Sequence, residues 1–316
     1  MDLVTGGAGF IGSHLVEALI ARGRAVRVLD DLSTGSLANL ASVGAKVEMI
    51  QGDILDLDVL RAAMRGVHVV FHEAAIRSVP RSVEDPALTN RVNVEGTLNV
   101  LMTAREVGVR RVVSASSSSV YGEADRLPLD ESAPPRPVSP YAVSKLAGEH
   151  YCRVFACLHG LSTVSLRYFN VFGPRQDPAS PYAAVVPRFI QAALAGVPLE
   201  IHGDGRQSRD FTHVRDVVAA NCLAAEAPGL AGEVINVAGG RSHSLMDIVE
   251  WLSRRLGHHG GTLRWVHTAP RPGDVRDTLA ALDRARTRLG YRPSMRFEAG
   301  LEDAFQYLAA MEPARR

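Results

Sequence analysis

A glycine-rich segment near the N-terminus places the strongest constraint on how this chain can fold. Residues 5–12 read Thr-Gly-Gly-Ala-Gly-Phe-Ile-Gly, between an apolar run and an amphipathic stretch. In this pattern Gly6 permits a tight turn, Gly9 lets the backbone approach a pyrophosphate, and Gly12 lets a helix pack closely on a strand. The N–H groups at the start of that helix would face the pyrophosphate. The segment therefore predicts a dinucleotide site, and a glycine-rich turn without a ligand is the alternative.

Short apolar runs alternate with amphipathic stretches through the first half of the chain. We expect strands at residues 2–5, 25–29, 46–50, 67–71, 111–114 and 163–168, and helices at 13–22, 59–64 and 92–106. The strands lack strict polar–apolar alternation, which suits strands that helices cover on both faces. The pattern predicts an α/β fold with a doubly wound, parallel (Rossmann-type) sheet.

The composition of the sequence changes after Gly173, where prolines become frequent and the expected helices and strands become shorter. We therefore predict a dinucleotide-binding domain at 1–170 and a smaller C-terminal α/β substrate domain at 171–316. Whether a segment of about 211–237, with a strand at 233–237, returns to the first domain is left open.

Composition excludes several classes of protein. The 316 residues include 35 Lys plus Arg and 34 Asp plus Glu, so the formal net charge is +1, which argues against nucleic-acid or membrane-surface binding. Three cysteines are too few for a disulfide scaffold. We find no signal-peptide pattern, no apolar stretch of about 18 residues and no set of metal ligands. We expect a soluble cytoplasmic protein without a metal.

Acidic residues follow the second and third expected strands. Asp30 ends the second strand, 18 residues after Gly12, where a carboxylate can accept hydrogen bonds from the adenosine ribose. Asp30 and Asp31 together would repel a 2′-phosphate, which favours NAD over NADP. Asp31 is equally well explained as a solvated turn residue. Asp53 is placed to reach the adenine, or alternatively to cap the next helix.

A tyrosine and a lysine stand four residues apart after a helix-starting Ser139-Pro140 pair. Tyr141 and Lys145 would then share one helical face. We expect the Lys145 ammonium, together with an oxidised nicotinamide, to lower the pKa of the Tyr141 phenol toward neutral, where it becomes a useful base. The serine-rich strand end at 114–119 lies where ligands bind in such sheets.

These segments together resemble the extended short-chain dehydrogenase/reductase superfamily, and within it the UDP-sugar 4-epimerases. The motifs that carry the resemblance are TGGAGFIG, FHEAA, NVEGT, SSSSVYG, SPYAVSK, LRYFNVFGPRQDP, RDFTHVRD and RPGD, and they span nearly the whole chain. The resemblance implies catalytic roles for Tyr141, Lys145 and Ser117. The cofactor-binding residues that we predict are Gly6, Gly9, Phe10, Ile11, Gly12, Asp30, Asp31, Asp53, Ile54, Ala74, Asn93, Tyr141, Lys145 and Tyr168.

The resemblance also implies a redox-neutral 4-epimerisation of a UDP-hexose through a 4-keto intermediate. Related dehydratases and decarboxylating enzymes usually carry carboxylates just before the VYG element, where this chain has Ser118 and Ser119. Epimerisation is therefore favoured over dehydration, which needs an extra acid/base group. A non-catalytic NAD sensor would be expected to lose Tyr141 or Lys145, and this chain keeps both.

Substrate contacts are expected mainly from the second domain. Arg209 and Arg271 resemble diphosphate clamps, with surface pairing to Asp210 and Asp274 as the alternative, and arginine forks suit phosphate oxygens. Thr278 resembles a gate residue small enough to admit plain and N-acetylated hexoses. The substrate-binding residues that we predict are Ser117, Asn170, Arg209, Arg271, Asp274, Thr278, Arg77 and Arg175.

Arg77 departs from the family pattern, because a small residue or proline is usual there. It could bind the cofactor pyrophosphate or a carboxylate at the fifth carbon of the sugar, or lie on a solvated loop. Together with Arg175 it keeps UDP-glucuronate 4-epimerisation open as an alternative. The helices expected at 92–106 and 141–158 carry apolar faces beyond what the sheet needs, and the resemblance implies that they pair in a homodimer.

Overall fold

The computed structural model describes residues 1–123, 125–178, 184–257, 262–269 and 275–311. Within them, the largest sheet has seven parallel strands in the order β11-β6-β5-β4-β1-β2-β3. These strands are β1 (Asp2–Thr5), β2 (Val26–Asp30), β3 (Val47–Gln51), β4 (Val69–His72), β5 (Arg111–Ser117), β6 (Ser162–Tyr168) and β11 (Glu233–Val237). The prediction of a doubly wound parallel sheet is confirmed. The strand at 233–237 joins the sheet beside β6, whereas the domain boundary near residue 170 stays a prediction.

Helices cover both faces of the sheet, and each face has its own core. Val4 and Val28 pack toward α1 and α8, while their neighbours Leu3 and Leu29 pack toward α2, α5 and α6. The alternation follows from the strand itself, since successive side chains point to opposite faces. The α-helices of the described residues, including α7, α9 and α11 of the smaller part described below, are α1 (Phe10–Ala21), α2 (Leu57–Met64), α3 (Val79–Glu84), α4 (Pro86–Asn90), α5 (Gly96–Glu106), α6 (Pro140–His159), α7 (Val185–Leu194), α8 (Val214–Glu226), α9 (Leu245–Gly257), α10 (Asp283–Leu289) and α11 (Phe297–Met311).

One expected helix differs in kind from its prediction. The stretch predicted as a single helix over 92–106 begins with a π-helical segment at Arg91–Glu95, and α5 continues from it. Such π segments are rare, and they often occur at functional sites. Short 3-10 turns lie at Leu37–Leu40, Gly44–Lys46 and Ser118–Tyr121.

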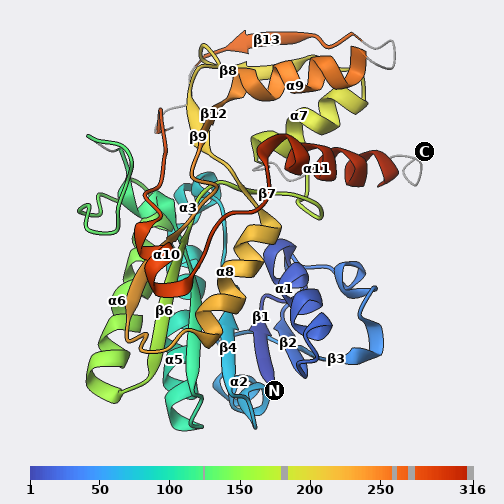
Figure 1. Cartoon of the computed structure of the whole chain (residues 1–316). Helices are drawn as coiled ribbons and strands as arrows, with labels where there is room; N and C mark the ends of the chain where they lie inside the picture. Colours follow the sequence, from blue (N-terminus) through green and yellow to red (C-terminus); the bar gives the residue numbers. More distant parts are fainter. Residues whose placement is uncertain (124, 179–183, 258–261, 270–274, 312–316) are drawn as a thin grey trace.

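The smaller part of the molecule lies beyond the carboxyl ends of the sheet strands, at the top of Figure 1. It contains β7 (Val171–Phe172), β8 (Leu199–His202), β9 (Ser208–Asp210), β10 (Thr212–His213), β12 (Ser242–Ser244) and β13 (Trp265–Thr268). They pair as β7 with β10 and β8 with β13, both parallel, and as β9 with β12, antiparallel. Its core forms where α7, α9 and α11 meet around buried side chains such as Phe172 and Ile248.

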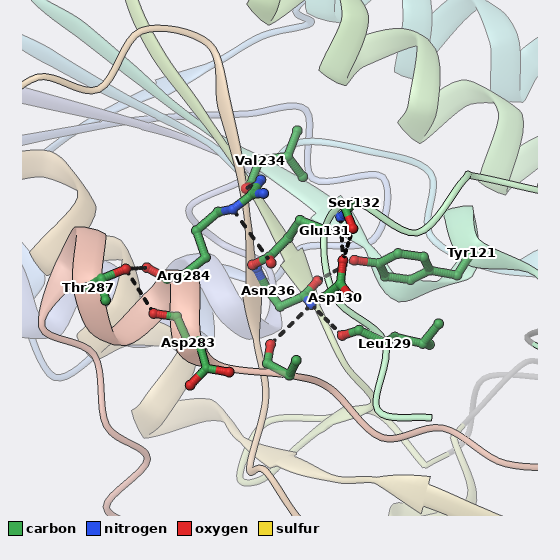
Figure 2. Close-up of polar contacts among 11 residues, drawn as sticks. Tyr121, Leu129, Asp130, Glu131, Ser132, Val234, Asn236, Asp283, Arg284 and Thr287 are labelled. Carbon is green, nitrogen blue, oxygen red and sulfur yellow. Dashed lines mark hydrogen bonds and ion pairs between the residues drawn. The ribbon is translucent and has the colours of Figure 1, made fainter. Parts of the chain in front are cut away.

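A buried polar cluster joins the end of β5 to the edge of the sheet (Figure 2). The Tyr121 hydroxyl donates to the Asn236 Oδ1 at 2.7 Å, and the Asn236 Nδ2 donates to the carbonyl oxygens of Leu129 at 3.0 Å and Ala281 at 3.3 Å. The Glu131 carboxylate accepts from the Asn236 backbone N–H at 2.8 Å. Tyr121 belongs to the VYG element, so the cluster fixes the backbone just after the serine-rich strand end.

Candidate active site

The glycine segment forms the turn that its spacing predicts. Gly6 has φ +68°, and a Cβ placed on it would lie 2.7 Å from the Ala74 backbone nitrogen, closer than real Cβ contacts allow. A Cβ on Gly12 would collide with the Gly6 carbonyl oxygen. The turn brings the chain to Gly9, the N-cap of α1, where no side chain caps the helix. A bare helix start beside a glycine backbone fits the pyrophosphate of a dinucleotide.

The carboxylate of Asp30 braces this turn. It accepts hydrogen bonds from the Ala8 and Leu32 backbone N–H groups, each at 2.9 Å. Burial raises its pKa above the ordinary value, in spite of these two bonds. Asp31 is exposed and accepts from Ser33, as expected of a turn residue. Asp53 is exposed and accepts from Leu55, while the cap of α2 is Asp56, so the alternative reading of Asp53 as the cap is wrong.

These residues line a pocket of about 740 Å³ across the carboxyl ends of the strands. All the predicted cofactor-binding residues except Asn93 line it, together with Arg77. Arg81, Arg91, Ala115 and Ser116 also contribute to its wall. The pocket extends from Asp30 and Asp53 at one end to Tyr141 and Lys145 at the other, which is the reach that a dinucleotide requires.

Asn93 holds the pocket wall rather than lining it. It is 3% exposed, and its Oδ1 accepts from the Ile76 N–H at 2.8 Å while its Nδ2 donates to the Ile76 carbonyl at 3.0 Å and to the Ser144 hydroxyl at 3.0 Å. All its described side-chain bonds are therefore to protein. The expectation that Asn93 contacts the cofactor is not met by this geometry, because the π-helical segment turns the amide toward the loop after β4 and toward α6.

Tyr141 and Lys145 share a face of α6 as predicted. Ser139 caps the helix, with its hydroxyl accepting from the Ala142 N–H at 3.2 Å, and Pro140 occupies the first turn. The Lys145 Nζ lies 6.0 Å from the centroid of the Tyr141 ring and donates to the Ala115 carbonyl at 2.9 Å. Lys145 is thus anchored on β5, and both side chains reach the pocket at the end of that strand.

The electrostatics of the pair differ from the expectation. The pKa of Tyr141 is raised, because burial outweighs a hydrogen bond with Ser117 and the positive charge of Arg77, and the charge of Glu73 raises it further. Burial also lowers the pKa of Lys145 to about 8. Among the chain's own groups the Tyr141 pKa is raised, and the lowering expected from Lys145 together with an oxidised nicotinamide stays a prediction. Lowering it requires a further positive charge beside the phenol.

The serines at the end of β5 have separate roles. Ser117 is 9% exposed, its hydroxyl donates to the Ser119 hydroxyl at 3.0 Å, and it acts to lower the pKa of the nearby Tyr141 phenol. Ser116 donates instead to the buried Glu149 carboxylate at 2.5 Å. The side chain of Ser117 is therefore the one of these two serines that acts on Tyr141, while Ser116 pairs with Glu149.

Glu73 is a pocket residue that the sequence reasoning quoted only as part of FHEAA. It follows β4, and its carboxylate accepts from the Tyr168 hydroxyl at 2.7 Å, while the Asn221 Nδ2 donates to the same hydroxyl at 2.8 Å. Burial raises the pKa of Glu73 to about 7. The signal that could have found it is an acidic residue directly after an otherwise apolar strand.

Some of the predicted substrate-binding residues contact one another in the smaller part of the molecule, and others do not. The Asn170 Nδ2 donates to the Thr278 hydroxyl at 3.2 Å and to the Asp210 carbonyl at 3.1 Å, which joins three segments on one side. Arg209 donates to the carbonyl oxygens of Ser208 at 2.9 Å and Arg276 at 2.7 Å. Arg271 and Asp274 lie outside the described residues.

Arg175 lies away from this group. It forms an ion pair with Glu17 of α1, and its guanidinium donates to the Ser13 hydroxyl at 3.3 Å. The contacts hold the loop after β7 against α1. The expectation that Arg175 meets the substrate is therefore not met, because this carboxylate on α1 already pairs with it.

The described residues contain neither a membrane-spanning helix nor a cluster of metal-ligating side chains. No helix among them is long and apolar enough to cross a membrane. No group of three or more His, Cys, Asp and Glu side chains among them is arranged to hold a metal ion.

Comparison with known proteins identifies the family. The model of the NAD dependent epimerase/dehydratase family matches residues 3–238. A UDP-glucose 4-epimerase from Mycolicibacterium smegmatis is 41% identical over 310 residues, which cover 96% of this chain and 97% of that protein.

Two solved structures are similar over nearly their whole length. A UDP-N-acetylglucosamine 4-epimerase from Methanobrevibacter ruminantium M1, in complex with UDP-N-acetylmuramic acid, is 39% identical with a TM-score of 0.92, covering 98% of both chains. A UDP-glucuronic acid 4-epimerase from Bacillus cereus, with UDP-glucuronic acid and NAD, is 34% identical with a TM-score of 0.90, covering 98% of this chain and 99% of that one. The chain therefore belongs to the NAD-dependent epimerase/dehydratase family, and its cofactor is NAD.

Proposed function

We propose that this protein is an isomerase that interconverts UDP-hexoses at the fourth carbon, acting on UDP-glucose and UDP-galactose and also on their N-acetylated counterparts. The observation that carries the proposal is that Tyr141 and Lys145 line the same pocket as the glycine turn, with Ser117 at the end of β5 acting on the Tyr141 phenol. A phenol, a hydroxyl and an ammonium beside a bound nicotinamide are the groups that oxidation of a secondary alcohol requires.

NAD, when bound, supplies the chemistry of accepting hydride from the fourth carbon of the sugar and returning it. Tyr141, as the phenolate, takes the proton from the 4′-hydroxyl. Ser117, which acts on the Tyr141 phenol from the end of β5, orients that hydroxyl and relays the proton. Lys145 binds the nicotinamide ribose, and its positive charge favours the phenolate form of Tyr141 over the protonated phenol. The 4-keto sugar rotates about its bond to the diphosphate, and hydride then returns to the opposite face of the fourth carbon. No net oxidation occurs.

The family also contains dehydratases, and the local chemistry argues against one here. Eliminating water requires an additional acid/base group beside the sugar. Ser118 and Ser119 occupy the positions just before the VYG element, and neither side chain can titrate near neutral pH. A 4-epimerase needs no such group.

Arg77 supports UDP-glucuronate as a second candidate substrate. It lines the pocket, and its charge acts on the Tyr141 phenol, so it lies near the reacting end. An arginine there suits a carboxylate at the fifth carbon. Arg175 no longer contributes to this alternative, because it pairs with Glu17.

The test incubates the purified protein separately with UDP-glucose, UDP-N-acetylglucosamine and UDP-glucuronate and separates the products by chromatography. We expect 4-epimers of the first two. A 4-keto-6-deoxy product would show a dehydratase, and epimerisation of the uronate alone would show the second candidate. NAD binding without turnover of any of them would favour a sensor. In the second case Arg77→Gln would abolish turnover, whereas a hexose epimerase would retain it.

A further inference from the structure

The pocket contains one carboxylate that the proposed mechanism does not use. Glu73 directly follows β4 and lines the pocket together with Tyr141, Lys145 and Tyr168. Its position is fixed from two sides, because its backbone N–H donates to the Thr5 carbonyl at 3.1 Å and its carboxylate accepts from Tyr168 at 2.7 Å. Tyr168 is held in turn by Asn221 from α8 at 2.8 Å. A buried network of this kind places the charge of Glu73 at a defined point.

Charged groups from several elements surround this point. Lys145 of α6 lines the same pocket as Glu73, and each acts on the other's pKa, while Tyr168 of β6 contributes the hydrogen bond. Tyr141 of α6 is affected by Glu73 and, with opposite sign, by Arg77 of the loop after β4. Lys145 is also affected by Glu149 and Cys152 on its own helix. His72 points away, toward the hydroxyls of Thr5 and Thr97.

We propose that Glu73 is a positioning residue whose negative charge holds protons on both Tyr141 and Lys145, and thereby sets the pH range in which the pair works. The inference rests on the proposed roles of these two residues. A carboxylate favours the neutral form of a nearby phenol and the charged form of a nearby amine. Glu73 therefore raises the pKa of Tyr141 and the pKa of Lys145. Both limbs of the pH–rate profile move to higher pH as a result.

The charge of Glu73 is present where it matters. Burial raises the pKa of Glu73 to about 7, and the pKa of Lys145 is about 8 while that of Tyr141 is higher still. Among the chain's own groups, Glu73 therefore loses its proton before Lys145 and Tyr141 do. Protonating Glu73 below neutral pH removes the effect.

Glu73→Gln isolates the charge, since the amide oxygen still accepts from Tyr168. The full-length protein is saturated with NAD, and the Tyr141 phenolate is titrated by its ultraviolet absorbance, as the difference from the same protein carrying Tyr141→Phe. We expect Glu73→Gln to lower the Tyr141 pKa by roughly one unit. Glu250→Gln removes an exposed carboxylate from α9 and should leave the titration unchanged. An unchanged or higher Tyr141 pKa in Glu73→Gln would overturn the proposal.

The pH profile of kcat/KM gives a second readout. Both limbs should move to lower pH in Glu73→Gln, because the base deprotonates earlier and the ammonium is lost earlier. A purely structural role would lower the rate without moving either limb, and that result contradicts the proposal. The phenolate titration needs no sugar, so it decides on Glu73 even where no UDP-sugar is turned over.

Tyr168→Phe serves where Glu73→Gln does not fold. The Tyr168 hydrogen bond lowers the pKa of Glu73, so losing it keeps Glu73 protonated to higher pH. The Lys145-dependent basic limb should then move to lower pH, by less than in the charge-removing variant. A basic limb that stays in place or moves to higher pH counts against Glu73.

Discussion

Tyr141 is the residue on which the proposed chemistry depends most directly. Its own surroundings favour the protonated phenol, since burial outweighs Ser117 and Arg77. The chain alone therefore holds the base in its resting state. The positive charge of an oxidised nicotinamide would counter the effect of burial on the Tyr141 pKa, so the proposed base becomes active only when the cofactor is in place.

Replacing Tyr141 by phenylalanine removes the proton acceptor and leaves the rest of the pocket wall. We expect Tyr141→Phe to bind NAD as the parent does and to lose about 10²–10⁴-fold in turnover, the usual contribution of a general base. Isothermal titration calorimetry with NAD and the epimer assay check the two parts. Tyr151→Phe, on the same helix and outside the pocket, is the matched control. Activity retained in Tyr141→Phe would contradict the assignment.

His72 gives a prediction about stability and pH. The side chain is 4% exposed, it hydrogen-bonds with Thr5 at 2.8 Å and Thr97 at 3.0 Å, and burial lowers its pKa to about 3. Its folded pKa lies below its unfolded value of 6.5, so its contribution to stability is present above pH 6.5 and is lost as the pH falls from 6.5 toward 3.

The comparison of parent and His72→Asn isolates this contribution from that of other titrating groups. We expect the difference in free energy of unfolding between the two proteins to shrink as the pH falls from 7 to 4.5. Urea denaturation at several pH values measures it. A difference that stays constant over this range would show that His72 is not buried neutral.

At the scale of single elements, the end of β5 is the segment that the site needs most. The Tyr121–Asn236 cluster ties that end to β11 and to the loop around Leu129 (Figure 2). Tyr121 is 2% exposed, and burial raises its pKa to about 12, so it remains a donor at all working pH values. Ser117 is the last residue of β5 and Lys145 donates to the Ala115 carbonyl of the same strand, so the cluster supports the groups proposed to be catalytic.

Removing one member of this cluster should be costly. Tyr121→Phe leaves the buried Asn236 oxygen without its described donor, and we expect a loss of about 1–3 kcal/mol in the free energy of unfolding. Thermal and urea unfolding measure the loss, and Asn236→Ala combined with Tyr121→Phe measures the coupling. If the double variant loses the sum of the two single losses, the two side chains do not act together.

Prediction from sequence succeeded for elements whose signal is local. The strands of the sheet were all predicted to within a few residues, because apolar runs and the glycine spacing carry that information in adjacent positions. The π-helical segment at Arg91–Glu95 was missed, since its apolar pattern is that of an ordinary helix. The rise of the Tyr141 pKa in the pocket without cofactor could not be predicted, because burial depends on residues far away in the chain.

The same limit applies to the arginines. Arg77 reaches the pocket, whereas Arg175, taken from an equally suggestive motif, pairs with Glu17. A sequence shows that an arginine is present but does not show which carboxylate the fold will bring to it. The predicted cofactor residues other than Asn93 all line one pocket, because they are tied to the ends of the strands, and the topology places those ends along one edge.

At the scale of the whole molecule, the outer faces of α5 and α6 are more apolar than a surface requires. Exposed side chains there include Met102, Val143, Val154 and Leu158, the last 73% exposed. Val143, Val154 and Leu158 fall on a helical stripe of α6. We propose that two copies of the chain pair through this surface, as the resemblance to the family implied.

Charges placed on that stripe should separate the copies. We expect the parent to migrate as a dimer and Val154→Glu with Leu158→Glu to migrate as a monomer, because two buried carboxylates per copy are costly to desolvate. Light scattering coupled to size-exclusion chromatography gives the mass. Val197→Glu, at an exposed valine in the smaller part, is the control. A parent that is monomeric at high concentration would refute the pairing.

The position of β11 has a consequence for synthesis on the ribosome. The strand completes the sheet beside β6, yet it is translated only after α7, α8 and the strands β7 to β10 have emerged. Until then the nascent chain presents β6 as an open edge, which is a template for pairing with other chains. Slow or interrupted translation before residue 233 would therefore yield aggregates rather than a smaller folded enzyme.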